Sequence, residues 1–362
     1  MLTAAAVISA ATLALASCAQ APGTGTQTPG ATTGGDTGKF KACMVSDSGG
    51  FDDKSFNQTS HDGLVKAEKE LGIATQKIES ASNADFAKNL QAMIDAKCNV
   101  VVTVGFLLAD ATKAAAAANP NINFVIVDSP SEGTLKNHKG LQFNTAESSF
   151  MAGYLAAGMS QSGKVGTFGG AKIPPVTIFM DGFSQGVAYY NQQKGKSVQV
   201  LGWDAAKQNG MFVPGQNPFD NTSGGKETAN SLIANGADIL LPVAGPSGIG
   251  ALQAAQEQGG KVNAIWVDTD GCKSAEPFCG QLLSSVYKGM DVAVFEAIKE
   301  AKDGKFTNTS YVGTLKNGGT GLSPFHEFES KVPAELKSEL DQLKTEIESG
   351  KIKIESQSQP KA

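Results

Sequence analysis

Short apolar runs alternate with amphipathic segments over most of the chain. Runs of β-branched and other apolar residues predict buried strands, whereas apolar residues at helical spacing predict helices. In the first part of the chain, the expected strands are 40–45, 74–79, 100–104, 124–127 and 141–143. The expected helices between them are 55–71, 85–96 and 109–118.

A second series of the same kind follows. Its expected strands are 164–168, 198–203, 239–243 and 264–267, and its expected helices are 148–160, 181–193, 226–235, 248–258, 284–303 and 333–350. Two such series predict an α/β protein with two parallel-sheet lobes. We expect the first lobe to span 39–145, with part of 272–305 returning to it, and the second to span 146–271 with part of 306–356. Two lobes leave a central cleft that a hinge can close on a small solute.

The start of the chain has a different character. Residues 1–17 are small and apolar, and their length suits the apolar core of a signal peptide better than a membrane span. Leu15-Ala-Ser-Cys18 resembles the bacterial lipobox, although no Lys or Arg precedes the apolar run. Residues 18–38 carry mostly Ala, Gly, Pro, Thr and Gln, which cannot form a core. We therefore expect a lipoprotein signal peptide, a lipidated, palmitate-bearing Cys18 and a flexible tether. The protein would then be anchored by lipid alone on the extracytoplasmic face of the cell membrane.

Composition and charge narrow the classes of function. Of the 362 residues, 41% are hydrophobic and 18% are charged, which is typical of a globular protein. The formal net charge of −5 argues against a nucleic-acid surface, because such a surface needs a basic face.

Four cysteines lie beyond Cys18, and an even number in an exported chain suggests two disulfides. Cys272 and Cys279 flank six residues and could close a short loop. Cys43 lies in the first expected strand and Cys98 just before the third, and these strands are neighbours in a 2-1-3 order. Zinc is the alternative, but the spacings do not suit it and the chain has only three histidines. We expect no metal site.

The segment 46–58 follows the first expected strand and precedes a helix. Loops at the carboxyl ends of parallel strands are where open α/β folds bind ligands. This loop offers the carboxylates of Asp47 and Asp53, the ring of Phe56 and the carboxamide of Asn57. The alternative is an ordinary turn that caps the helix, with Phe56 in the core.

Several motifs occur together in an order that is specific, although each is weak alone. They are Asp52-Asp-Lys-Ser-Phe-Asn57, Ile126-Val-Asp128, Pro174-Pro-Val-Thr-Ile-Phe179 with Gly182-Phe-Ser-Gln-Gly186, Gly236-Ala-Asp238, Pro242-Val-Ala-Gly245, Trp266-Val-Asp-Thr-Asp270 and Ser285-Val-Tyr-Lys-Gly-Met-Asp-Val-Ala-Val294. From about Lys39 to the last helix, the chain resembles the basic membrane protein family of bacterial lipoproteins. That family includes the purine-nucleoside receptor type of ABC-transporter substrate-binding protein.

The resemblance implies a type I periplasmic-binding-protein fold, with two α/β lobes joined by several crossings. The family's ligand is typically a nucleoside, whose base lies between aromatic rings and whose ribose is held by charged groups. By motif, Phe56 would stack on one face of the base and Phe179 on the other, with Trp203 as the alternative to Phe179. The other implied ligand residues are Asp47, Asn57, Asp128, Gly245, Asp268 and Lys288.

The resemblance also implies the roles of these residues, and the roles suit the chemistry of a nucleoside. Asp47 and Asp128 would accept hydrogen bonds from the base or the ribose, and Asp268 and Lys288 would bind the ribose hydroxyls. The backbone at Gly245 would allow close approach. The expected strand ends carry no cluster of Lys and Arg such as a phosphorylated ligand needs. Without the motifs, Phe179 and Trp203 fit core positions equally well, and Lys288 fits a solvated helix face. Asp270 is then as good a candidate for the ligand carboxylate as Asp268.

We therefore expect a monomeric substrate-binding lipoprotein of an ABC importer, which binds a nucleoside, with purines favoured, and a permease, and needs no cofactor. An enzyme is not expected, because 163–170 lacks the spacing of a dinucleotide loop and no histidine lies in a catalytic motif. The alternatives are a sugar- or autoinducer-binding protein of the same fold and a surface interaction lipoprotein without a transport role. The loop 207–221 connects the expected strand that ends at Trp203 to the expected helix that begins at Lys226, and it is longer than the family's usual connection. If this loop covers the cleft, Phe212 or Phe219 could alter the ligand preference.

Overall fold

Residues 39–360 are described by the computed structural model, and their apolar runs form two six-stranded sheets and one two-stranded ribbon. The predicted signal peptide, Cys18 and the tether lie outside these residues. No helix between residues 39 and 360 has both the length and the apolar character needed to cross a membrane.

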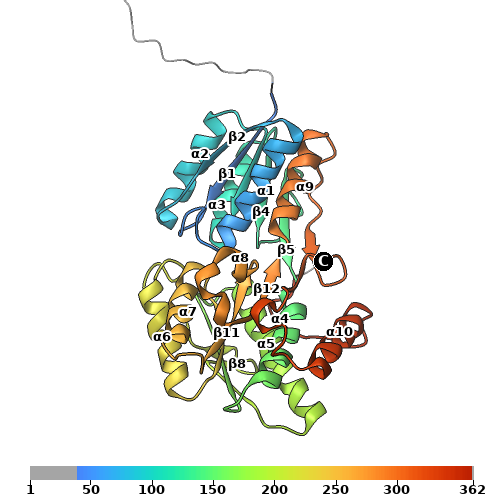
Figure 1. The fold of residues 1–362 in the computed structure, drawn as a ribbon. Coiled ribbons are helices and arrows are strands. Elements are labelled where there is room, and N and C mark those ends of the chain that lie inside the picture. Colours follow the sequence, from blue (N-terminus) through green and yellow to red (C-terminus); the bar gives the residue numbers. More distant parts are fainter. Residues whose placement is uncertain (1–38, 361–362) are drawn as a thin grey trace, which may run out of the picture. The chain divides into compact units, whose positions relative to one another are not determined.

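Lobe 1 consists of the first sheet and its helices (Figure 1). Its strands are β1 (Lys41–Ser46), β2 (Ala74–Ile78), β3 (Val100–Val104), β4 (Asn123–Val127), β5 (His138–Phe143) and β13 (Tyr311–Gly313). Its helices are α1 (Phe56–Leu71), α2 (Phe86–Asp95), α3 (Ala109–Ala118) and α9 (Met290–Lys302). The order β13-β5-β4-β3-β1-β2 is parallel throughout. Because α1 and α9 pack on one face and α2 and α3 on the other, the central strands are buried on both faces.

Lobe 2 consists of the second sheet and its helices. Its strands are β6 (Lys164–Gly169), β7 (Gln199–Leu201), β10 (Ile239–Val243), β11 (Asn263–Asp268), β12 (Leu282–Lys288) and β14 (Thr320–Leu322). Its helices are α4 (Thr145–Met159), α5 (Pro174–Lys194), α6 (Thr222–Ala234), α7 (Gly248–Gln256), α8 (Gly271–Ser274) and α10 (Ala334–Glu348). In the order β14-β12-β11-β10-β6-β7, β14 alone is antiparallel to its neighbour. The helices α4, α5 and α10 pack on one face and α6 and α7 on the other.

The chain passes between the lobes at three places in the described range. These are the connections from β5 to α4, from β12 to α9 and from β13 to β14. As a result, α9 lies beside α1 although the two helices are far apart in the sequence (Figure 1). Two parallel-dominated α/β lobes joined by several crossings agree with the predicted fold class.

Both expected disulfides are present. Cys43 is bonded to Cys98 with their Cα atoms 5.9 Å apart. Cys272 is bonded to Cys279 with a Cα–Cα distance of 4.6 Å. The first pairing follows from the strand order, because β1 lies between β2 and β3 as predicted.

The prediction of a single helix over 284–303 is wrong. Its first residues belong to β12, and only Met290–Lys302 are helical. Valine and tyrosine in this segment suit a strand, and Gly289 separates the strand from the helix. Lys288 is therefore the last residue of a buried strand and does not lie on a solvated helix face.

Two other boundaries differ from the prediction for local reasons. Helix α5 begins at Pro174, ahead of the predicted 181–193, because proline is favourable in the first turn, where its missing N–H is not needed. The predicted strand 198–203 is interrupted at Gly202, whose φ is 85°, so that Trp203 belongs to the ribbon of β8 (Trp203–Asp204) and β9 (Asn209–Gly210).

Candidate functional site

A cavity lies where strands of both lobes end. Its lining combines apolar and aromatic side chains with a few polar groups, which is typical of small-molecule sites. Every ligand residue predicted from the sequence lines it: Asp47, Phe56, Asn57, Asp128, Phe179, Gly245, Asp268 and Lys288. The structure therefore brings the predicted set together, although the residues come from both lobes.

The loop after β1 is held by the carboxylate of Asp53. Its oxygens accept hydrogen bonds from the backbone N–H groups of Ser55 (3.0 Å), Asn57 (2.9 Å) and Gln58 (3.0 Å) at the start of α1. Burial raises the pKa of Asp53 to about 6, while these N–H groups oppose the shift. Asp53 thus satisfies free N–H groups at the start of α1 and fixes Phe56 and Asn57 at the edge of the cavity.

Asp47 and Asn57 form a polar pair in the lobe 1 wall. Asp47 Oδ1 accepts a hydrogen bond of 3.0 Å from Asn57 Nδ2. Burial raises the pKa of Asp47 to about 8, and the bond from Asn57 opposes the shift only in part. At neutral pH Asp47 is therefore mostly protonated and can donate as well as accept, whereas the sequence predicted an acceptor alone.

The surroundings of this pair leave little space and one unused acceptor. Gly105 follows β3 with a φ of 115°, and a Cβ atom there would lie 2.2 Å from Asp47 Oδ2. Only glycine suits both the φ and the contact. Asn57 is 1% exposed, and its Oδ1 has no hydrogen-bond partner among residues 39–360. A buried oxygen of this kind is satisfied when a ligand brings a donor.

Lys288 joins the two lobes through carboxylates. Its Nζ lies 2.6 Å from Asp128 Oδ2 of lobe 1 and 3.5 Å from Asp268 Oδ1 of lobe 2. Burial lowers the pKa of Lys288, but the two carboxylates outweigh that effect, so that its pKa lies above the ordinary value. Lys288 is therefore a fixed cation at the centre of the site.

Asp128 and Asp268 occupy corresponding positions in the two lobes. Asp128 follows β4 directly and Asp268 ends β11, and both have left-handed backbones, with φ values of 66° and 70°. Such a conformation in a residue other than glycine costs on the order of 1–3 kcal/mol and is concentrated at functional sites. The strain turns both carboxylates toward the same lysine.

Aromatic rings surround this cation. Lys288 Nζ lies 5.0 Å from the ring centroid of Phe56 and 5.2 Å from that of Phe179. Phe56 is partly exposed, whereas Phe179 is only 1% exposed and belongs to the lobe 2 core. Phe219 also lines the cavity and is partly exposed. Because Phe219 is less buried than Phe179, it is the better candidate for the second ring.

The other aromatic candidates lie in the core of lobe 2. Trp203, the predicted alternative to Phe179, does not line the cavity; its Nε1 donates to Asp181 Oδ1 at 2.9 Å. Phe212 packs edge-on against Trp203 with a centroid distance of 6.2 Å. The loop 207–221 is thus divided between a core contact at Phe212 and a cavity contact at Phe219. Sequence reasoning noted both rings but had no signal that separates them.

Further hydrogen bonds connect the lobes beside the cavity. Ser55 Oγ donates to Asp268 Oδ2 at 2.9 Å and lies 3.3 Å from the Val267 backbone oxygen. Trp266 Nε1 donates to the backbone oxygen of Lys54 at 3.3 Å. The start of α1 therefore contacts lobe 2 directly.

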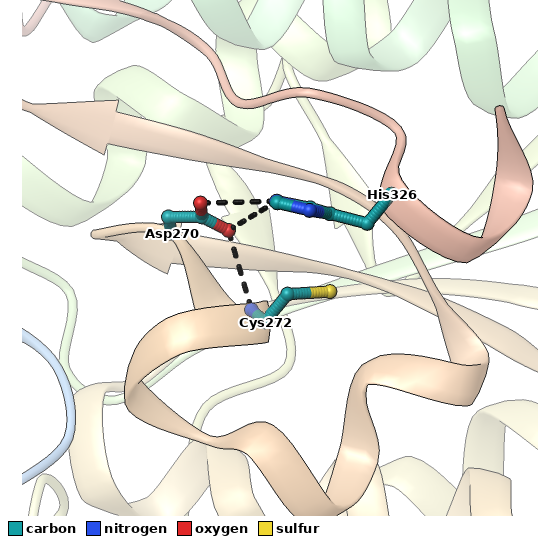
Figure 2. Close-up of side chains that lie close together, drawn as sticks. All are labelled: Asp270, Cys272 and His326. Atoms are coloured by element: carbon teal, nitrogen blue, oxygen red, sulfur yellow. Dashed lines mark hydrogen bonds and ion pairs between the residues drawn. The ribbon is translucent and has the colours of Figure 1, made fainter.

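A separate cluster of possible metal ligands consists of Asp270, Cys272 and His326 (Figure 2). Both oxygens of Asp270 lie 3.0 Å from His326 Nε2, and one accepts a 3.3 Å bond from the Cys272 backbone N–H. The Cys272 sulfur is bonded to Cys279 and is not a thiolate. Two remaining ligands fall short of a structural zinc site, and the cluster ties α8 to the segment that contains His326.

Comparison with known proteins agrees with this architecture. Residues 40–358 match the family model described as ABC transporter substrate-binding protein PnrA-like. The chain is 30% identical to the ABC transporter nucleoside-binding protein BmpA of Lactococcus lactis subsp. cremoris, over 97% of this chain and 99% of that protein. It is 29% identical to basic membrane protein A of Borreliella burgdorferi, over 87% of this chain and 88% of that protein.

Solved structures show the same fold. An ABC transporter solute-binding protein from Aeropyrum pernix K1 superposes with a TM-score of 0.77 at 25% identity, covering 87% of this chain and 92% of that chain. A solute-binding protein from Conexibacter woesei superposes with a TM-score of 0.66 at 20% identity, covering 88% and 99%. These relatives are binding components of transporters and not enzymes, and the periplasmic-binding-protein fold is confirmed. The chain belongs to the PnrA-like family of ABC transporter substrate-binding proteins, to which the basic membrane proteins are related.

Proposed function

We propose that this protein is the nucleoside-binding component of an ABC importer, with a purine nucleoside preferred. It acts as a monomer on the extracytoplasmic face of the membrane, anchored by lipid at Cys18, and delivers its ligand to a permease. The name of the Lactococcus lactis relative, a nucleoside-binding protein, supports this class of ligand.

The observation that carries the proposal is the buried Lys288 between Asp128 and Asp268, with Phe56 beside it. Adjacent ribose hydroxyls can accept from the ammonium group and donate to the carboxylates at the same time. The ring of Phe56 offers a flat apolar surface next to that polar group. A nucleoside has the same neighbouring parts, a hydroxylated sugar and a flat base.

The base would lie between Phe56 of lobe 1 and a ring of lobe 2. Phe219 supplies that ring by its exposed face, and Phe179 supports the wall behind the Lys288 side chain. Each stacking contact contributes about 1–3 kcal/mol. The edge of the base would then meet Asp47 and Asn57, which together offer a donor and an unused acceptor. Purine and pyrimidine edges both carry donors and acceptors, so the preference for a purine rests on the resemblance of the motifs to purine-nucleoside receptors.

A thermal-shift assay with inosine, guanosine, adenosine, uridine, galactose and arabinose tests the ligand class. We expect a purine nucleoside to raise the melting temperature and the two sugars to leave it unchanged. Phe56→Ala should remove the nucleoside shift. The control Phe51→Ala, a core residue of lobe 1 that does not line the cavity, should lower the melting temperature but keep the shift. Stabilisation by a sugar alone would contradict the proposal.

The proposed anchor is tested separately from ligand binding. Wild-type protein expressed with its native N-terminal segment should partition into the detergent phase of a Triton X-114 extraction, and Cys18→Ala should move it to the aqueous phase. Equal partitioning of both would disprove lipid anchoring at Cys18 and leave the ligand assignment untouched.

A further inference from the structure

A second cavity adjoins the nucleoside cavity. It shares three lining residues with the first: Phe106, Asp128 and Pro175. Asp128 is also the carboxylate that pairs with Lys288. A ligand bound at this carboxylate therefore has room to extend into the second cavity.

One wall of the second cavity is the segment 357–360, which follows α10. This segment is fastened to α5 by side-chain hydrogen bonds. Ser356 Oγ donates to Asp181 Oδ2 at 2.6 Å, and Ser358 Oγ lies 2.7 Å from Thr177 Oγ1. Asp181 is 1% exposed, so the wall is tied to a buried group of lobe 2.

The opposite wall belongs to lobe 1. It includes Phe106, Pro130, Gln142 and Phe143, which lie after β3, after β4 and at the end of β5. Within residues 39–360, the segment 355–360 makes no hydrogen bond to lobe 1. The second cavity therefore lies between the lobes, as the first does, and its width depends on how they meet.

The lining indicates the chemistry of an occupant. Asp128 is the only ionisable side chain that lines the second cavity in the described chain, and Lys288 already neutralises it. The other side chains are phenylalanine, proline and isoleucine, together with uncharged amides and one hydroxyl: Gln142, Gln357, Gln359 and Ser358. Among residues 39–360, no lysine or arginine lines this cavity, so the described lining offers a phosphate group no counter-charge. Apolar faces with scattered amides suit an uncharged group that carries hydroxyls.

We propose that this second cavity is a subsite for a neutral, hydroxylated substituent that extends from the sugar of the nucleoside past Asp128. The inference rests on the proposed nucleoside function and deepens it. The protein would then accept modified nucleosides with an uncharged extension and exclude nucleotides.

Gln357 gives a clean test of the subsite. It is exposed and lines the second cavity but not the first, and it makes no hydrogen bond within the described residues. Gln357→Trp should fill the cavity without disturbing the nucleoside site. Gln192→Trp, the same change at an exposed position of α5 outside both cavities, is the control.

The probes for calorimetric titration are inosine, its three derivatives with a 2-hydroxyethyl group on O2′, O3′ or O5′, and inosine 5′-monophosphate. Wild-type protein should bind at least one derivative with an affinity within about threefold of its affinity for inosine. It should bind the monophosphate at least about 100-fold more weakly than inosine. Gln357→Trp should lower the affinity for that derivative by about tenfold or more, while the affinity for inosine changes by less than about twofold. Gln192→Trp should change neither.

A charge substitution provides a gain of binding. Gln357→Lys supplies the missing cation and should strengthen monophosphate binding by about tenfold.

Three results would disprove the proposed subsite. Wild-type protein would bind none of the three derivatives, it would bind the monophosphate tightly, or Gln357→Trp would lower the affinities for inosine and for its derivatives equally. Failure of inosine itself to bind wild-type protein would instead refute the nucleoside function, and with it the subsite.

Discussion

The two lobes contribute different chemistry to one cavity. The lobe 1 wall carries most of the polar groups, namely the carboxyl groups of Asp47, Asp53 and Asp128 and the carboxamide of Asn57. The lobe 2 wall is mainly apolar, and its charged members are Lys288 and Asp268. A ligand that satisfies both must present hydrogen-bonding edges to one lobe and a flat apolar face to the other. A nucleoside meets that requirement better than a sugar, whose polar groups surround the ring.

The largest expected effect comes from removing the ammonium group of Lys288, the lobe 2 cation that pairs with Asp128 of lobe 1. Lys288→Met leaves the carboxylates of Asp128 and Asp268 buried without a cation, and breaking such a pair costs about 3–5 kcal/mol. We expect nucleoside affinity, measured by calorimetry, to fall at least about 100-fold.

Lys139 provides the matched control for this substitution. It is also buried and ion-paired, at 2.6 Å from Glu300, but does not line the cavity. Lys139→Met should lower the free energy of unfolding and leave nucleoside affinity unchanged. If Lys288→Met kept affinity within about tenfold, the contribution of lobe 2 to ribose binding would be disproved.

The second effect concerns the apolar face of lobe 2. Phe219→Ala should lower nucleoside affinity by about 5- to 150-fold, because one stacking contact is worth about 1–3 kcal/mol. Phe212→Ala, in the same loop but packed on Trp203, should destabilise the fold with little change in affinity. The opposite ranking, with Phe212 important for binding and Phe219 not, would show that the loop meets the ligand differently.

The third effect tests the protonated acid of lobe 1. The folded protein holds the Asp47 proton up to about pH 8, whereas an unfolded chain releases it at about pH 4. The folded state then binds more protons than the unfolded state between these values. Asp47 therefore makes the free energy of unfolding fall as pH rises, by up to about 1.4 kcal/mol per pH unit.

Asp47→Asn isolates that dependence, because an amide does not titrate. Urea unfolding of the ligand-free proteins at pH 6 and pH 8 should show a smaller loss of stability in the variant. Measurement above pH 6 limits the contribution of Asp53, whose pKa is about 6. Equal slopes for the two proteins would mean that Asp47 is already ionised.

The smallest effect concerns the direct hydrogen bond between the lobes. Ser55→Ala removes the 2.9 Å bond to Asp268 and should weaken nucleoside binding by about fivefold, since a hydrogen bond of this kind contributes about 1 kcal/mol. Ser60→Ala is the control, because Ser60 Oγ bonds within α1 to the Phe56 backbone oxygen. An equal change in both variants would assign the effect to α1 and not to the contact between lobes.

How far the sequence predicts the site depends on how local each part is. The loop after β1 was predictable, because Asp53, Phe56 and Asn57 lie within one turn at the start of α1. The disulfide from Cys43 to Cys98 followed from strand order. The sequence predicts a helix through Lys288, whereas the structure has a strand there, because its strand character depends on pairing with two neighbouring strands.

Features set by tertiary packing could not be predicted. Nothing in the loop 207–221 tells which phenylalanine faces the cavity, because that choice depends on the contact of Phe212 with Trp203. The raised pKa of Asp47 depends on burial under Gly105, far along the chain. The wall at 357–360 depends on a bond from Ser356 to Asp181 across lobe 2. In each case a long-range contact decides the role of a residue whose type alone is ambiguous.

The central claim is that one nucleoside binds between the lobes, with its ribose at Lys288 and its base on Phe56. A crystal structure of the purified protein with inosine tests it most directly. The account predicts ribose hydroxyls within hydrogen-bonding distance of Lys288 Nζ and of the Asp128 or Asp268 carboxylate, and the base stacked between Phe56 and Phe219. Inosine bound with its base away from Phe56, or outside this cavity, would contradict the account.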